Sequence, residues 1–278
     1  MLTVCNTERR NTQGEGQGGA LDTSDALLSV DGVTLQYPTG NAVVTATWRV
    51  SFDVHSMDRL ILLGPSGCGK SSLLKAVGGY LKPVEGDIRL NGANVTHPGP
   101  DRMMVFQEFD QLFPWRTVLE NVMFPMTVRR EWGVREKKER AMASINKVGL
   151  AAFAHAYPHQ LSGGMKQRAA IARAMAMEPD VLLMDEPFAA LDALTRRRLQ
   201  DELLELWEDL KFTMLFVTHA IDEATRIGSR IVVLSAHPGQ VRAELACPNH
   251  WAEEPRRQLE QQITDMLLEY QAPQNEQS

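Results

Sequence analysis

Five apolar runs, each four residues long, occur at intervals along the chain between residues 60 and 234. Continuous runs of this length are typical of parallel strands that are covered on both faces. The runs are Leu60–Leu63, Met103–Phe106, Val181–Met184, Met214–Val217 and Ile231–Leu234. The pattern therefore predicts an α/β fold with a mostly parallel sheet.

Before these runs, apolar and polar residues alternate in shorter segments. Such alternation predicts half-buried strands, and glycine or proline between the segments predicts turns. The segments are Leu27–Val30, Val33–Leu35 and Val50–Val54, with turn signals at Asp31-Gly32 and Pro38-Thr39-Gly40. We expect an N-terminal antiparallel β layer.

The section from about residue 108 to residue 177 has helical periodicity. Met142, Ile145 and Val148 recur at helical spacing before Gly149, which we expect to end that helix. A further helix is expected from Gly164 to Met177, before Pro179. We therefore expect a helical subdomain inserted into the α/β core.

The two ends of the chain differ from this core. Residues 1–26 are polar and glycine-rich, so we expect a disordered tail. Residues 248–278 are expected to form a short helical extension, whose apolar stripe is expected to pack on the core rather than bind a partner. The stripe comprises Leu259, Ile263, Met266, Leu267 and Tyr270.

Composition excludes several classes of protein. The chain has 278 residues and a net charge of −6, which gives no support for nucleic-acid binding. No apolar run approaches the roughly 20 residues that span a bilayer, and the N-terminus is charged where a signal peptide is apolar, so we expect a cytosolic chain. Cys5, Cys68 and Cys247 have neither metal-ligand spacing nor the even number of a disulfide framework.

A glycine-rich loop follows the first apolar run and matches the pattern of a phosphate-binding P-loop. Glycines let successive N–H groups wrap a phosphate, a lysine reaches the outer phosphates, and a hydroxyl binds Mg²⁺. The loop comprises Gly64, Pro65, Ser66, Gly67, Cys68, Gly69, Lys70 and Ser71, and is followed by Ser72. A helix is expected over Ser71–Val77, which is the context that this motif requires. We expect Cys68 to be a small filler without chemistry.

Polar side chains follow the other apolar runs. Asp185 is placed to hold Mg²⁺ through water, and Glu186 to polarise an attacking water. His219 and Gln107 also follow runs, at the sheet edge where ligands bind in open α/β folds, and the Gln107 amide can reach Mg²⁺ or the water. Tyr37, expected on an early loop, can stack on adenine.

A second helix start in the chain also suits an anion. Ser162 can cap a helix, and Gly163 and Gly164 leave backbone N–H groups uncovered by side chains. Free donors and the helix dipole both favour negative charge there. Taken alone, the segment is far more typical of an ordinary glycine-rich cap on a surface helix than of an anion site.

Together these motifs resemble those of the ATP-binding subunits of ABC transporters, over about residues 27–247. Walker A matches residues 64–72, the signature motif Leu161–Arg168, and Walker B Val181–Glu186. The adenine-stacking aromatic matches Tyr37, the Q-loop Gln107, the D-loop Ala190-Leu191-Asp192, and the switch histidine His219. The resemblance implies a P-loop NTPase core with an antiparallel β subdomain and an inserted helical subdomain.

The resemblance also implies a head-to-tail dimer, with each ATP between Walker A of one subunit and the signature motif of the other. It implies that Lys70 and the loop amides bind the phosphates, and that Asp192 belongs to the nucleotide site. Ser162, Gly163 and Gly164 would close over the γ-phosphate of the opposite subunit's ATP.

For the metal and the reaction, the resemblance implies further roles. Ser71 and Gln107 would coordinate Mg²⁺, and Asp185 would hold it through water. Glu186 would be the general base, while His219 would contact the γ-phosphate and hold the water and Glu186 in place.

Within this family, four segments look most like the nitrate, sulfonate and taurine importer branch. They are Phe113–Val118, Glu120–Val122, Leu191–Arg196 and His237–Val241. This implies an ATPase on the cytoplasmic face of the membrane, bound to a permease and served indirectly by a solute-binding protein. Two departures are a stretch from Gln107 to Trp115 that is one residue longer, and Ala189 in place of a glycine.

Three other functions were weighed. A lipid or drug exporter ATPase would carry nearly the same motifs, although the Pro114-Trp115-Arg116 segment favours import. Soluble ABC proteins of translation or DNA repair usually have two nucleotide domains or a long coiled coil, and neither is visible here. A P-loop kinase leaves Ser162–Gly164 and His219 unexplained.

Overall fold

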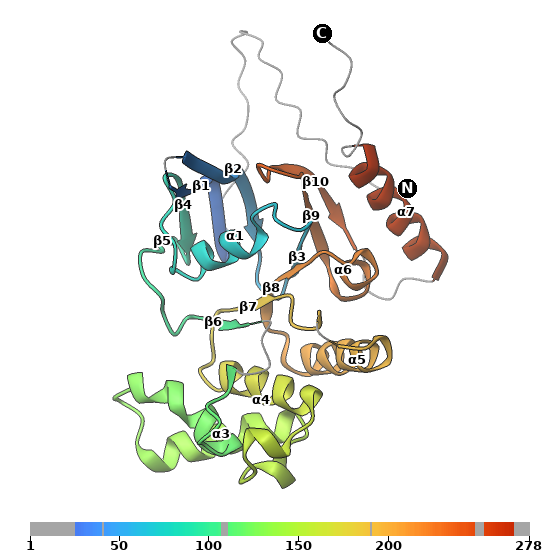
Figure 1. Cartoon of the computed structure of the whole chain (residues 1–278). Helices are drawn as coiled ribbons and strands as arrows, with labels where there is room; N and C mark the ends of the chain where they lie inside the picture. The colour runs from blue at the N-terminus through green and yellow to red at the C-terminus, as the bar shows by residue number, and fades with distance from the viewer. Residues whose placement is uncertain (1–25, 41, 107–110, 190, 248–252, 270–278) are drawn as a thin grey trace, which may run out of the picture. The chain divides into compact units, whose positions relative to one another are not determined.

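The computed structural model describes residues 26–269, apart from 41, 107–110, 190 and 248–252. The chain divides into two compact units, whose helices and strands are labelled in Figure 1. Unit 1 combines residues 1–96 with 217–278, and unit 2 comprises residues 97–216. The expected tail, apart from residue 26, lies outside the described residues.

Unit 1 contains an antiparallel sheet in the order β2-β1-β4-β5. Its strands are β1 (Leu28–Thr39), β2 (Ala42–Val54), β4 (Glu85–Leu90) and β5 (Ala93–Asn94). The β layer was predicted correctly, but the prediction of a turn at Asp31-Gly32 was wrong. Gly32 has φ +61° and lies inside β1, where the pairing register shifts between Val30 and Val33. A glycine with positive φ marks a β-bulge as readily as a turn, and here the strand continues through it.

The rest of unit 1 is built on parallel pairing between β3 (Arg59–Leu63) and β9 (Arg230–Leu234). All five residues of β3 are buried, as expected for a strand covered on both faces. An antiparallel strand, β10 (Val241–Ala246), pairs with β9. β4, β5 and β10 were not predicted, because their residues are mostly polar or half-exposed and form no apolar run.

Three helices belong to unit 1: α1 (Lys70–Val77), α6 (Ile221–Ile227) and α7 (Glu253–Glu269). In α7, Leu259 and Ile263 of the predicted stripe are buried, whereas Met266 and Leu267 are half-buried. The Thr225 hydroxyl in α6 donates to the Glu260 carboxylate at 2.9 Å. Tyr270, the last residue of the predicted stripe, lies outside the described residues.

Unit 2 contains the parallel pair β6 (Arg102–Val105) and β7 (Val181–Asp185). Between them lie helical segments, and after β7 come α5 (Ala193–Leu210) and β8 (Thr213–Thr218), which ends in unit 1. The segments between β6 and β7 are α2 (Val118–Met123), η3 (Phe124–Val128), α3 (Val134–Lys147), η4 (Ala151–Phe153), η5 (Pro158–Gln160) and α4 (Gly163–Met175). Gly149 adopts φ +68° just after α3, as its predicted role in ending that helix requires. None of the described helices is long and apolar enough to cross a bilayer.

Asn121 fixes the loop that leads into α2. Its side chain is completely buried, and its amide nitrogen donates to the carbonyls of Phe113, Arg116 and Thr117 at 3.0–3.1 Å. Its side-chain oxygen accepts from the Phe113 N–H at 2.7 Å. One buried amide therefore satisfies four backbone groups of residues 113–117.

Replacing Asn121 with alanine should lower the free energy of unfolding by about 2–4 kcal/mol, because buried backbone groups lose their partners. Urea unfolding of the full chain measures this change. The exposed Asn146→Ala in α3 serves as the matched control and should stay within about 0.5 kcal/mol of the wild type. Equal losses in the two variants would contradict the role given to Asn121.

Candidate functional site

The glycine-rich loop connects β3 to α1 and is tightly enclosed by its own unit. Gly67 and Gly69 adopt φ +81° and +91°, which other residues rarely adopt. A Cβ on Gly69 would lie 2.7 Å from the Ala46 carbonyl oxygen, and one on Gly64 would lie 2.9 Å from that of Leu234. The loop conformation therefore requires glycine at these positions.

Lys70 and the start of α1 give this loop the chemistry of an anion site. The Lys70 ammonium is buried and donates to the carbonyls of Gly64 at 2.8 Å and Pro65 at 2.9 Å. No side chain caps α1, whose N-cap residue is Gly69. Uncapped N–H groups, the positive end of the helix and a lysine fit a phosphate.

Within the described part of the chain, no cluster of side chains forms a ready magnesium site. The described residues contain no group of three histidine, cysteine or acidic side chains able to hold a metal ion. Protein-bound Mg²⁺ in nucleotide sites commonly uses one or two protein groups together with phosphate oxygens and water. For Ser71 in the loop and Asp185 at the end of β7, the role at Mg²⁺ stays a prediction.

Cys68 lies inside the loop and is buried. Burial raises the pKa of its thiol, and the nearby Lys70 charge only partly opposes that rise. A protonated buried thiol is a poor nucleophile. The structure therefore supports the prediction that Cys68 is a filler.

Unit 1 also holds two of the other predicted residues. Tyr37 was expected on a loop, but it lies near the end of β1, paired with Val44 and half-buried. That expectation was wrong because the strand runs on to Thr39 and ends only at the Pro38-Thr39-Gly40 turn signal. His219 directly follows β8 and is exposed, as a residue at a strand end should be.

Unit 2 holds the two predicted acids. Asp185 is the last residue of β7 and is buried, and Glu186 follows it half-buried. Glu186 adopts φ +43°, a left-handed conformation that is uncommon for a residue with a side chain. Such strain often occurs at functional sites and persists only where the surrounding structure fixes the residue.

Ser162 and Asp192 each cap a helix of unit 2. The Ser162 hydroxyl accepts from the Met165 N–H at 3.3 Å, which confirms Ser162 as the N-cap of α4, with Gly163 and Gly164 in the first turn. Asp192 caps α5 by accepting from the N–H groups of Leu194 and Thr195 at 3.1 and 3.0 Å. These hydrogen bonds lower the pKa of the Asp192 carboxyl.

The predicted site is thus divided between the two units. Unit 1 carries the glycine-rich loop, Tyr37 and His219, while unit 2 carries Asp185, Glu186, Ser162–Gly164 and Asp192. Gln107 and the D-loop residue Ala190 lie outside the described residues.

The turn His237-Pro238-Gly239, which the sequence associates only with the importer branch, packs on the glycine-rich loop. The Gly239 N–H donates to the Ala46 carbonyl at 2.9 Å, and a Cβ on Gly239 would lie 2.1 Å from the Cys68 carbonyl oxygen. His237 lies beside Gly67, with its Nε2 3.4 Å from the position of a Cβ there. The glycine of His237-Pro238-Gly239 was the only signal of this close approach.

Comparison with known proteins gives a consistent family match. The family model described as ABC transporter matches residues 48–189. The taurine import ATP-binding protein TauB of Rhizobium johnstonii is 47% identical over 78% of this chain and 82% of its own. The aliphatic sulfonates import ATP-binding protein SsuB of Bacillus cereus is 42% identical over 77% of this chain and 83% of its own.

Other matches extend this set. The bicarbonate transport ATP-binding protein CmpD of Synechocystis sp. is 43% identical over 77% of this chain and 76% of its own. A solved dimeric ATP-binding cassette in a post-hydrolysis state, bound to ADP and Pi, superposes with a TM-score of 0.68. It is 32% identical, and the match covers 80% of this chain and all of that one.

The buried thiols should react slowly with iodoacetamide in the native chain. At about pH 8.5, an unperturbed thiol is partly ionised, whereas burial raises the pKa of Cys68, and that of Cys247 to about 12. Mass spectrometry of digested protein should find both peptides largely unlabelled, and fully labelled after urea unfolding as the control. Rapid native labelling of Cys68 would contradict the filler role.

Proposed function

Because this chain belongs to the ABC transporter family and is an ABC ATPase, we propose that it powers solute import through a membrane permease. The observation that carries this proposal is its 42–47% identity, over about three quarters of the chain, to import or transport subunits named for taurine, sulfonates and bicarbonate. The solutes named for these relatives are small and share an anionic oxygen group, a sulfonate in taurine and the aliphatic sulfonates and the anion itself in bicarbonate, so we propose a solute of that kind. The same relatives favour import over lipid or drug export.

ATP would be bound first by the glycine-rich loop. Lys70, with the loop amides of residues 64–69 and the start of α1, would hold its phosphates, and Tyr37 would stack on the adenine. Bound ATP supplies the phosphoanhydride bond whose hydrolysis drives transport. The uncapped start of α1 and the buried ammonium of Lys70 support this assignment.

Mg²⁺ would be held by Ser71 and Gln107, with Asp185 acting through water. Asp185 is buried at the end of its strand, which supports a fixed position for its carboxylate.

Glu186 would accept the proton of the attacking water, and His219 would hold that water and Glu186 in place. Glu186 is half-buried and directly follows the buried Asp185 at the end of β7, which supports this assignment.

A second copy of this chain would complete the site. One chain carries two helix starts suited to phosphate, α1 and α4, but a head-to-tail dimer would bring α4 of one copy to the ATP held by the other. Ser162, Gly163 and Gly164 would then donate to the γ-phosphate, with Asp192 nearby at the start of α5. The dimeric state of the solved cassette bound to ADP and Pi supports this arrangement.

A cluster of aromatic residues in unit 2 is the surface that we assign to the permease. Phe113 contacts Phe124 edge to face at 4.7 Å between ring centres, and the Arg116 guanidinium lies 4.9 Å from the Phe124 ring. Trp115, beside them, is 70% exposed. An exposed apolar cluster marks an interaction surface. Through a permease, the chain would act at the cytoplasmic face of the membrane, with a solute-binding protein as an indirect partner.

Glu186→Gln should retain ATP binding, lose hydrolysis by about 100-fold or more, and accumulate as an ATP-bound dimer. The amide cannot accept the proton, while the phosphate contacts remain. Phosphate release and size-exclusion chromatography with ATP measure both effects, and the exposed Glu139→Gln is the matched control. Hydrolysis at the wild-type rate would argue against Glu186 as the base.

Ser162→Arg should abolish hydrolysis while ATP binding to isolated monomers stays unchanged, because the residue would act on the other copy's nucleotide. ATP titration at low protein concentration measures binding to the monomer, and the rate of phosphate release measures hydrolysis. Ser162→Ala controls for loss of the helix cap, which costs about 1 kcal/mol of stability. If the monomer's own affinity for ATP fell in the arginine variant alone, the action across the dimer would be refuted.

A further inference from the structure

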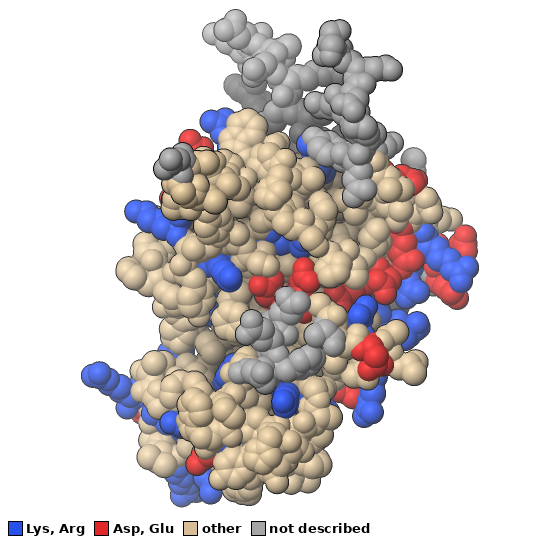
Figure 2. Space-filling model, in the orientation of Figure 1, with Lys and Arg blue, Asp and Glu red and all other residues tan. Residues whose placement is uncertain are grey.

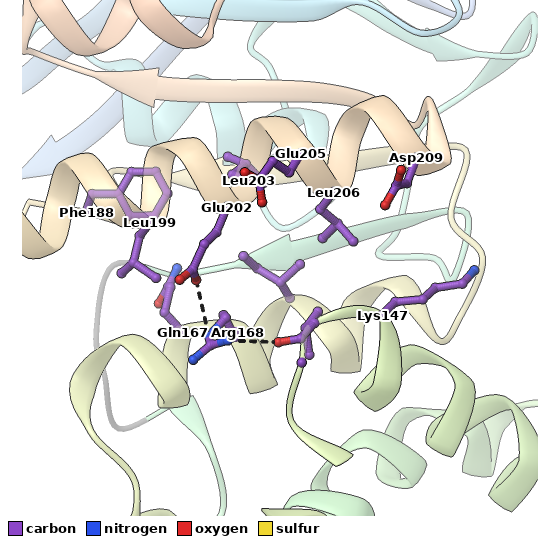
Figure 3. A pocket seen from close by; sticks show the side chains of 13 residues that line it. Lys147, Gln167, Arg168, Phe188, Leu199, Glu202, Leu203, Glu205, Leu206 and Asp209 are labelled. Atoms are coloured by element: carbon purple, nitrogen blue, oxygen red, sulfur yellow. Dashed lines mark hydrogen bonds and ion pairs between the residues drawn. The ribbon is translucent and has the colours of Figure 1, made fainter. Parts of the chain in front are cut away.

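A cavity of about 270 Å³ lies within unit 2, between α4, α5 and the end of α3 (Figure 3). Its size is just below that of typical small-molecule sites, roughly 300–1,000 Å³. The apolar part of its wall comprises Ile171, Phe188, Leu199, Leu203 and Leu206. None of these side chains has a role in the ATPase proposed above.

A buried polar side chain in the cavity wall lacks a partner. Gln167 is only 1% exposed, and its side-chain oxygen accepts from the Gln111 amide at 3.5 Å. Among the described residues, its amide nitrogen has no hydrogen-bond partner. In Figure 3 this nitrogen points towards α5, across the cavity. A buried donor left unpaired is unfavourable, and an acceptor inside the cavity would satisfy it.

The charges around the cavity restrict that acceptor to a neutral group. Arg168 forms an ion pair with Glu202, 3.3 Å between its Nε and the carboxylate, although neither of these two atoms has a hydrogen-bond partner among the described residues. Its guanidinium also donates to the Val148 carbonyl at 3.1 Å (Figure 3). The other charged residues are Lys147 and the acids Glu205 and Asp209, all exposed at the rim. Two cations against three anions leave the lining negative, which disfavours an anionic ligand.

We propose that this cavity binds a small, neutral, mostly hydrocarbon molecule with one carbonyl oxygen, which accepts from the Gln167 amide. Its hydrocarbon part lies against the leucines of α5 and Ile171 of α4. The cavity is close to the start of α4, because a Cβ on Gly164 would lie 3.4 Å from the Leu199 side chain. A bound molecule therefore contacts both α4 and α5 near the signature motif.

Two probes of matching shape test this site in the full chain. Benzophenone carries a carbonyl oxygen between two rings, whereas diphenylmethane has the same rings without an acceptor. Methyl NMR titration should show shifts of the Leu199, Leu203 and Leu206 methyls, with benzophenone binding about tenfold more tightly. No binding of either probe, equal affinity, or shifts only elsewhere would overturn the proposal.

Variants assign the preference to particular residues. Gln167→Leu should abolish the preference for benzophenone while retaining diphenylmethane binding; a retained preference would overturn the role of Gln167. Leu206→Trp should fill the cavity and abolish binding of both probes. Leu210→Trp, on the same helix but outside the cavity lining, is the matched control and should bind both like the wild type. Probe binding retained by Leu206→Trp would place the probes elsewhere and overturn the site.

Discussion

The absence of space for a Cβ around the glycine-rich loop is the constraint on which the rest of unit 1 depends. Backbone oxygens of Ala46 in β2 and Leu234 in β9 approach the loop so closely that only glycine fits at residues 69 and 64. The antiparallel layer and the parallel strands of unit 1 therefore meet at a backbone that must stay bare. A backbone without side chains at these positions also lets an anion approach the loop closely, so packing and anion binding depend on the same glycines.

The helix starts that we assign to phosphate, those of α1 and α4, differ in whether a side chain caps them. Helix α1 begins at Gly69 without a side-chain cap. Helix α4 begins at Ser162, whose hydroxyl already satisfies one N–H group. We read the first as the primary phosphate site and the second as a site that acts only when another molecule presents its phosphate.

Many of the buried strands and the glycine-rich loop could be predicted from the sequence, because each depends on residues that are adjacent in the chain. Apolar runs such as Val181–Met184 gave buried strands, and the glycines with Lys70 gave the loop. Edge strands such as β10 were not predicted because their polar residues form no continuous apolar run. Gly32 was wrongly predicted to lie in a turn because bulges and turns share its positive φ. The turn at Gly239 and the cavity beside Gln167 depend on residues far apart in sequence, which no local pattern reveals.

The hydrogen bonds of Lys70 have a consequence for the energetics of the nucleotide cycle. Its ammonium donates to the carbonyls of Gly64 and Pro65 within the loop itself. An arriving phosphate would compete with these carbonyls, so the lysine exchanges partners instead of gaining them from solvent. Each exchange would contribute the difference between a charged and a neutral acceptor, on the order of 1 kcal/mol, rather than the full strength of a charge-assisted hydrogen bond. Product release would return the ammonium to these carbonyls and so would leave no buried cation unpaired.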